Sequence, residues 1–147
     1  MNSIKINLLI YLSAVLLLFS CTVEPKDIAY GHDHCALCDM TVVDKTHAAQ
    51  YVTSKGKAYM FDAVECLVRK INKDNNEEQL AFILVIDYNR PGELVNAKDA
   101  YYLISENIKS PMGANLSAFS NSKLAQKAKS EFGGEVFSWE ELKNKLK

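Results

Sequence analysis

The stretch that decides how this chain is organised is His32-Asp33-His34-Cys35-Ala36-Leu37-Cys38-Asp39-Met40. It places thiols, imidazoles and a thioether side by side, a mixture that an ordinary apolar core does not need. Such groups are soft ligands, and soft ligands favour monovalent copper over hard cations. We therefore expect a copper site here, with Cys38 and Met40 as ligands and with Cys35 and His34 as further candidates.

The segment after the second cysteine is rich in β-forming residues, so we expect an extended strand from Cys38 to Val43. Side chains alternate along a strand, which would place the sulfur atoms of Cys38 and Met40 on one face. A third sulfur ligand is expected from Met112, which stands between a rigid proline and a flexible glycine in a polar loop. By contrast, Cys66 lies among apolar residues at helical spacing, and we interpret it as a buried, inert thiol.

The pair Cys35 and Cys38 leaves other chemistries open. Thioredoxin-type redox proteins use a Cys-x-x-Cys pair that opens a helix, whereas a β-forming run follows here. The same thiols could join His32 and His34 in a zinc site, but no second ligand pair follows at zinc-finger spacing. A disulfide between them would close a very small loop and constrain the chain little. Copper binding, a zinc-stabilised module and a thiol oxidoreductase therefore remain competing hypotheses.

The first 20 residues predict export. An apolar run, 6–19, follows a short start that carries Lys5, and its length suits a signal-peptide core better than a membrane span. A small residue directly before Cys21 is typical of a bacterial lipoprotein cleavage site, so we expect loss of residues 1–20 and acylation of Cys21. The acyl chains would anchor the domain to a bacterial membrane, facing the periplasm, with residues 21–30 as a tether.

The composition and motifs of the chain argue against nucleic-acid binding and against catalysis. The 147 residues carry 17 basic and 18 acidic side chains, a net charge of −1, which gives no electrostatic case for nucleic acid. We find no Ser/His/Asp arrangement, phosphate loop or carboxylate pair that predicts catalysis, so we expect no enzyme, and the isolated His47 is expected at the surface. If Cys21 is acylated, three cysteines remain, and at least one must be free, metal-bound or joined to another molecule.

Local patterns predict an α+β domain over residues 31–147. Asp62 and Glu65 have the spacing of a helix capping box. Each half of the domain runs strand, strand-like segment, helix, strand, so we expect two related β-β-α-β units, in lobes of about 31–90 and 91–147, that share one core. The expected strands are 48–53, 58–61, 81–86, 99–105 and 135–137, and the expected helices begin at Asp62, at Asn121 or Ser122, and at Ser138.

Several motifs, in order along the chain, resemble the NosL family. The most specific are Cys38-x-Met40 and Pro111-Met112-Gly113, and the resemblance covers about residues 34–138. The other matching segments are Ala48-Ala49-Gln50-Tyr51-Val52, Gly56-Lys57-Ala58-Tyr59, Phe61-Asp62, Glu65-Cys66, Ala100-Tyr101-Tyr102, Ala118-Phe119 and Gly133-Gly134.

The resemblance implies a copper-binding envelope lipoprotein that delivers Cu(I) for the assembly of nitrous oxide reductase in denitrification. It also implies a lipid anchor at Cys21 and a two-lobed α+β fold. Carried over by matching motif, Cys38, Met40 and Met112 are the copper ligands, whereas the roles of Cys35 and the nearby histidines stay open. The expected partners are the membrane and the apo enzyme that receives copper, and the protein is expected to be a monomer or a metal-linked dimer.

Overall fold

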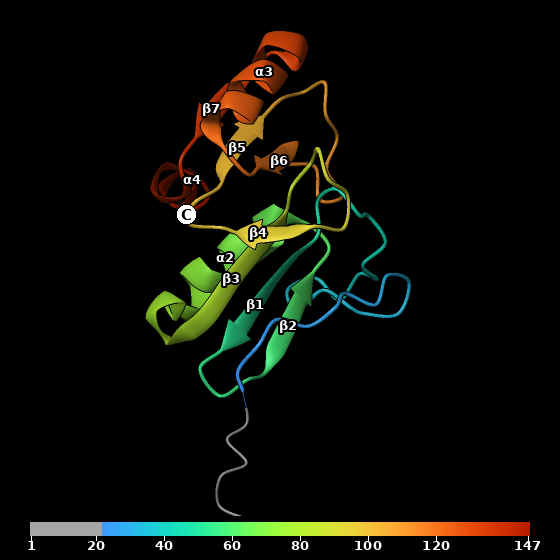
Figure 1. Ribbon diagram of the computed structural model, residues 1–147, viewed down its shortest axis with the longest axis vertical. Coiled ribbons are helices and arrows are strands. Elements are labelled where there is room, and N and C mark those ends of the chain that lie inside the picture. The colour runs from blue at the N-terminus through green and yellow to red at the C-terminus, as the bar shows by residue number, and fades with distance from the viewer. Residues whose placement is uncertain (1–21) are drawn as a thin grey trace, which may run out of the picture.

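The computed structural model describes residues 22–147, so the predicted signal peptide and Cys21 lie outside the described residues. In that part of the chain, two antiparallel sheets and three α-helices form an α+β fold (Figure 1), which confirms the predicted fold class. None of these helices has the length and apolar character that crossing a bilayer requires.

The first unit is a four-stranded sheet with strand order β2-β1-β3-β4 and one helix. Its central hairpin joins two strands whose sequences are mostly apolar or aromatic, as sheet positions favour. In chain order the elements are β1 (Ala49–Thr53), β2 (Ala58–Phe61), α2 (Val64–Asp74), the 3-10 turn η1 (Glu77–Gln79), β3 (Leu80–Ile86) and β4 (Leu94–Asn96). The edge strand β4 was not expected from the sequence.

The second unit repeats the same order of elements around a three-stranded sheet, β6-β5-β7. Its elements are β5 (Tyr101–Ile104), β6 (Leu116–Phe119), α3 (Ser122–Phe132) and β7 (Glu135–Phe137), and α4 (Trp139–Lys145) follows. In both units the first strand lies between the second strand and the strand that follows the helix. The expected pair of β-β-α-β units is therefore present, while the residue at which one lobe ends stays a prediction.

Helix α2 joins the two units because both of its sides are covered. It contacts β1 and β2 of the first sheet, and it also contacts β6 and α4 of the second unit. One cluster of buried side chains runs through this interface, with Phe61 and Leu67 from the first unit and Tyr102, Leu116 and Trp139 from the second. The units thus share a core, and the ends of α2 lie where they meet.

The helix ends show which local signals the fold uses. Asn121 accepts a hydrogen bond from the backbone N–H of Leu124 at the start of α3, and Ser138 with Glu141 forms a complete capping box on α4. The capping box predicted at Asp62 and Glu65 is wrong, because Ala63 is the N-cap residue of α2 and makes no side-chain cap. Both carboxylates make other contacts, described below.

The segment predicted as a tether contacts the domain from Lys26 onward. The backbone N–H of Lys26 donates to Gln50 Oε1 at 2.9 Å, and Gln50 Nε2 donates to the Lys26 carbonyl at 2.6 Å. Ile28 packs against a small cluster that contains Val42 and Ile86. The chain therefore enters the thiol-bearing stretch already attached to the first sheet.

Candidate metal centre

The stretch 35–40 folds as a tight turn. The backbone N–H of Cys35 donates to the Met40 carbonyl at 2.8 Å, and the N–H of Asp39 donates to the Cys35 carbonyl at 2.9 Å. Asp39 has φ 63°, in the left-handed region, and its side chain is exposed. The extended strand predicted from Cys38 to Val43 is therefore wrong, because a left-handed residue between Cys38 and Met40 ends the alternation of side chains.

This turn is fixed against the end of strand β2. The backbone N–H of Ala36 donates to the Met60 carbonyl at 2.9 Å, and His34 and Thr41 form an isolated β-bridge at the base of the turn. Strand β2 ends at Phe61, and the chain continues through Asp62 into α2. The thiols of the turn are therefore held beside the first residues of α2.

Three thiols and one carboxylate meet at this place. The Sγ atoms of Cys35, Cys38 and Cys66 and one carboxylate oxygen of Asp62 all lie within 4.8 Å of one another, and we call these residues the thiol cluster. All three thiols are free, and only Cys38 is more than slightly exposed. Cys66 is buried as expected, but its thiol contacts other sulfur atoms, so the interpretation as an inert thiol missed its place in the cluster.

Asp62 is the residue of the thiol cluster that has a carboxylate oxygen without a hydrogen-bond partner. Its Oδ1 accepts a hydrogen bond from Cys38 Sγ at 3.6 Å, whereas its Oδ2 is buried and has no hydrogen-bond partner. Leaving a buried polar atom unpaired costs free energy, roughly 1–3 kcal/mol. An unpaired carboxylate oxygen beside three thiols is typical of a ligand-binding cluster, in which the donor atoms face one another and not other protein groups.

The electrostatics of the cluster favour one thiolate. A hydrogen bond from the Cys66 thiol, against the opposing effect of burial, lowers the pKa of Cys35 from 9.0 to about 6. The same pairing raises the pKa of Cys66, and burial raises that of Cys38. The backbone N–H groups that also stabilise the Cys35 thiolate belong to Cys38, Asp62 and Leu37. At neutral pH the cluster therefore holds one negative sulfur next to two protonated thiols.

The predicted methionine ligands differ in burial. Met40 is 49% exposed. Met112 is partly buried and packs against the hydrophobic cluster that includes Cys35 and Cys66, with Cys38 also in contact with that cluster. Residue 112 of the second unit therefore packs against the shared core to which Cys35 and Cys66 also belong.

His34 and His32 are exposed and lie outside the thiol cluster. The Nδ1 atom of His34 lies 3.1 Å from the carbonyl oxygen of Asp39.

His47 corrects two expectations. It is buried, with 3% of its surface exposed, so the prediction of a surface histidine is wrong. Its Nδ1 lies 2.8 Å from Asp44 Oδ2, and its Nε2 lies 3.1 Å from Ser117 Oγ, so a Ser/His/Asp arrangement does exist. Ser117 is fully buried in β6. A buried hydroxyl offers no access to a substrate, and the arrangement is best explained as a hydrogen-bonded link between the two units.

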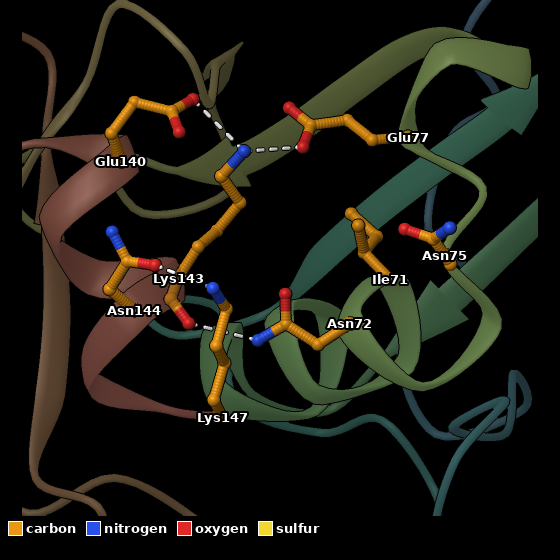
Figure 2. Close-up of a pocket in the computed structure, with 8 residues that line it drawn as sticks. All are labelled: Ile71, Asn72, Asn75, Glu77, Glu140, Lys143, Asn144 and Lys147. Atoms are coloured by element: carbon orange, nitrogen blue, oxygen red, sulfur yellow. Dashed lines mark hydrogen bonds and ion pairs between the residues drawn. The ribbon is translucent and has the colours of Figure 1, made fainter.

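A pocket of about 320 Å³ lies at the other end of α2, between that helix and α4 (Figure 2). Lys143 Nζ stands between Glu77 Oε2, at 2.5 Å, and Glu140 Oε1, at 2.9 Å. Asn72 donates to the Lys143 carbonyl at 3.0 Å. These charged groups are paired with one another, so the pocket wall is a structural contact between the helices.

The donor set of the thiol cluster suits a soft monovalent cation. Thiolate and thioether sulfur select Cu(I), whereas Asp62 is the only oxygen donor in the cluster. Cys66 and Asp62 were missed as candidates because they follow the turn by more than twenty residues, and no local pattern connects them to it. The one available signal was the odd number of cysteines left after acylation of Cys21.

Comparisons with known proteins agree on one family. A family model described as NosL matches residues 27–147. The copper-binding lipoprotein NosL of Stutzerimonas stutzeri is 28% identical over 125 residues, which span 80% of this chain but only 65% of that relative. The crystal structure of the copper chaperone NosL from Shewanella denitrificans matches with a TM-score of 0.71 at 20% identity, covering 82% of this chain and 96% of that one, a likeness of fold.

Proposed function

This chain belongs to the NosL family, and from that premise we propose that it is a Cu(I) chaperone of the bacterial cell envelope. The observation that carries the proposal is the thiol cluster, in which three free thiols lie within 4.8 Å of one another. Sulfur donors at this density favour Cu(I) over harder cations. The names of the relatives, a copper-binding lipoprotein and a copper chaperone, support the same cargo.

We propose Cys38, Met40 and Met112 as copper ligands. Cys38 is the most exposed thiol of the cluster, and Met40 is an exposed thioether two residues further on, so both are accessible to an arriving ion. Cys35 and Cys66 are close enough to Cys38 to share the ion. His34 is exposed at the base of the same turn and would add a nitrogen ligand while copper enters or leaves.

The chemistry follows from the protonation of the thiols. Copper binds thiolates, so binding releases thiol protons. The Cys35 thiolate, whose pKa is about 6, supplies one negative sulfur at neutral pH without proton loss. Cys38 must lose its proton, which points toward Asp62. Two or three sulfur ligands leave Cu(I) room for one more, so a client ligand can join before a chaperone ligand leaves, and the ion passes without free release.

Delivery completes the proposed role. Acylation of Cys21 would anchor the domain to a bacterial membrane on the periplasmic side. Several acyl chains on this residue would make the anchoring stable, because a single chain binds a membrane only reversibly. The proposed client is apo nitrous oxide reductase, which places the protein in denitrification as a carrier and not as an enzyme. A reconstitution in which copper-loaded protein restores activity to that apo enzyme, and free copper with a chelator does not, tests this step.

The copper site is tested by anaerobic titration of Cu(I) against a chromophoric chelator. Wild-type protein is expected to bind one ion tightly, and the double variant Cys38→Ser, Met112→Leu is expected to lose that binding. Met60→Leu is the matched control, because the Met60 sulfur accepts a hydrogen bond from Gln50 at 3.1 Å and packs in a different cluster. Tight 1:1 binding that survives in the double variant would refute the site.

A thiol oxidoreductase is the second candidate, and the low pKa of Cys35 favours it. A redox nucleophile must also reach an external disulfide, whereas Cys35 is 3% exposed and the more exposed Cys38 has a raised pKa. Reduction of an external disulfide that is abolished by Cys35→Ala, with copper affinity intact, would favour the redox role. A zinc-stabilised module would instead be stabilised by zinc and not by copper.

A further inference from the structure

The loop that carries Met112 has a closed base. Ser105 N–H donates to the Asn115 carbonyl at 3.0 Å, and Gly113 N–H donates to the Ser110 carbonyl at 3.1 Å. Gly113 and Asn115 both have positive φ, 76° and 55°, so the chain turns sharply on each side of residue 114. We call residues 110–115 the methionine loop, and its connections place Met112 at the tip.

Glu65 holds this loop from the other unit of the fold. It lies in the first turn of α2 and is fully buried. Its Oε1 accepts a hydrogen bond from Ser110 Oγ at 2.5 Å and another from the N–H of Ala114 at 3.2 Å. Ser110 Oγ in turn accepts from the N–H of Asn115 at 2.9 Å. The two groups that bind Glu65 therefore stand on either side of Met112 in the sequence.

The same short segment of chain also serves the thiol cluster. Asp62 and Cys66, which flank Glu65 in sequence, both belong to that cluster. A shift of the methionine loop relative to α2 would therefore break hydrogen bonds to a residue of the same helical turn as Cys66.

Stability alone does not account for the carboxylate. Glu65 Oε2 is buried without a hydrogen-bond partner, and a buried polar atom without a partner lowers the free energy of unfolding. What the carboxylate supplies is a strong acceptor for two groups of the methionine loop.

We propose that Glu65 is the positioning residue that holds Met112 against the thiol cluster, so that copper affinity depends on a side chain that is not itself a ligand. This inference rests on the proposed function, in which Met112 binds copper. Removing the acceptor frees the loop and makes the thioether contribute less to binding.

The test is a double-mutant cycle on Cu(I) affinity with Glu65→Ala, Met112→Leu and the double variant, measured anaerobically by chelator competition. Loss of a residue that orients a metal ligand typically weakens binding about 10- to 100-fold, and we expect this from Glu65→Ala. In the Met112→Leu background the same change should have no further effect, because the side chain that it positions is gone. X-ray absorption of the copper-loaded Glu65→Ala protein should show one sulfur ligand fewer.

Two further variants separate positioning from general damage. Glu65→Gln keeps an oxygen acceptor for Ser110 and Ala114 and should restore most of the affinity. Glu77→Ala removes a largely buried carboxylate near the other end of α2 and should leave the affinity unchanged. If Glu65→Ala does not fold, Ser110→Ala takes its place in the same cycle, since it removes one of the two hydrogen bonds between Glu65 and the methionine loop.

The outcomes separate this inference from the proposed function. If Met112→Leu weakens binding but Glu65→Ala does not, or weakens it equally in both backgrounds, Glu65 does not act through Met112 and the inference is overturned while the copper ligand stands. If Met112→Leu itself leaves affinity and sulfur count unchanged, the ligand assignment fails and the inference fails with it. A Glu65→Gln protein as weak as Glu65→Ala would also overturn it.

Discussion

Buried or partly buried carboxylates lie near both ends of helix α2, but they differ in how many of their oxygens have hydrogen-bond partners. Near the C-terminal end, Glu77 accepts a hydrogen bond from Lys143 Nζ at 2.5 Å (Figure 2) and another from Trp139 Nε1 at 2.8 Å, so both of its oxygens are engaged. Near the N-terminal end, Asp62 and Glu65 are more deeply buried, and each has one oxygen without a partner. Three free thiols surround the first of these carboxylates.

This difference separates structural polar groups from functional ones. Burying a charged group lowers stability unless partners compensate, and near the C-terminal end a lysine and an indole N–H do so. Near the N-terminal end compensation is incomplete, which is the pattern expected where a protein keeps donor atoms for a ligand. The contact of buried His47 with Ser117 and with the partly exposed Asp44 is also structural, because both ring nitrogens of His47 have protein partners.

The largest expected effect is stabilisation by copper at the N-terminal end. Saturation with Cu(I) at about a thousand times the dissociation constant should raise the free energy of unfolding by about 4 kcal/mol. The double variant Cys38→Ser, Met112→Leu should lose most of this gain, and Glu77→Gln should keep it. Anaerobic urea unfolding of apo and loaded protein measures the difference. An equal gain in the double variant would place the metal elsewhere.

The next largest effect is a loss of stability that involves only the groups near the C-terminal end of α2. Glu77→Ala leaves the Trp139 N–H without its partner and Lys143 with Glu140 alone, and should lower the free energy of unfolding by about 2 kcal/mol. Because these groups lie outside the thiol cluster, Cu(I) affinity should not change. Urea unfolding and chelator competition on the same protein give both values. A weakened copper affinity would show that the two ends of α2 are coupled.

A smaller effect should appear as pH dependence of the apo protein. The folded pKa of Cys35, about 6, lies below its ordinary value of 9.0, so the unfolded state binds more protons between these limits. The free energy of unfolding should therefore rise from pH 6 toward pH 9 and fall as the pH drops through 6. Above pH 9 the raised pKa of Cys66 acts in the opposite direction, since the unfolded chain loses that proton first.

Cys35→Ser provides the comparison for this pH profile. It should remove the rise between pH 6 and pH 9, and Cys66→Ala should move the thiolate titration of Cys35 upward because its main hydrogen-bond donor is lost. Thiolate ultraviolet absorbance follows the titration, and urea unfolding across the pH range follows the stability. A wild-type thiolate that titrates only near pH 9 would contradict the proposed pairing.

The smallest expected effect on stability is that of Met40→Leu. Met40 is 49% exposed, so the free energy of unfolding of the apo protein should change by no more than about 0.5 kcal/mol. Copper transfer to a competing chelator should nevertheless change in rate, because an exposed thioether is the proposed point of exchange. Stopped-flow transfer kinetics measure this rate, and an unchanged rate would remove Met40 from the proposed ligands.

Local patterns predicted the elements of this fold well because short-range forces determine them. The predicted strands 48–53 and 58–61, on either side of a glycine turn, form the β1–β2 hairpin, and Ser138 with Glu141 caps α4 as such spacing predicts. The same spacing at Asp62 and Glu65 was misleading, since both side chains bind groups far away in sequence. A capping pattern states which hydrogen bonds are available, and tertiary packing decides which of them form.

The candidate site was only half predictable for the same reason. Cys35 and Cys38 are close in sequence, so their proximity could be foreseen, whereas Cys66 is brought to them by the β1–β2 hairpin and the start of α2. The turn geometry at Asp39 and the burial of His47 depend on backbone hydrogen bonds and on a contact with β6 that spans 70 residues. Neither leaves a pattern in the local sequence.

The hydrogen bonds between Glu65 and the methionine loop connect the first unit of the fold to the second. An excised half of this domain would inherit either the three clustered thiols or the distal thioether, never both. Grafting the complete proposed donor set into another scaffold would therefore require the whole pseudo-symmetric body.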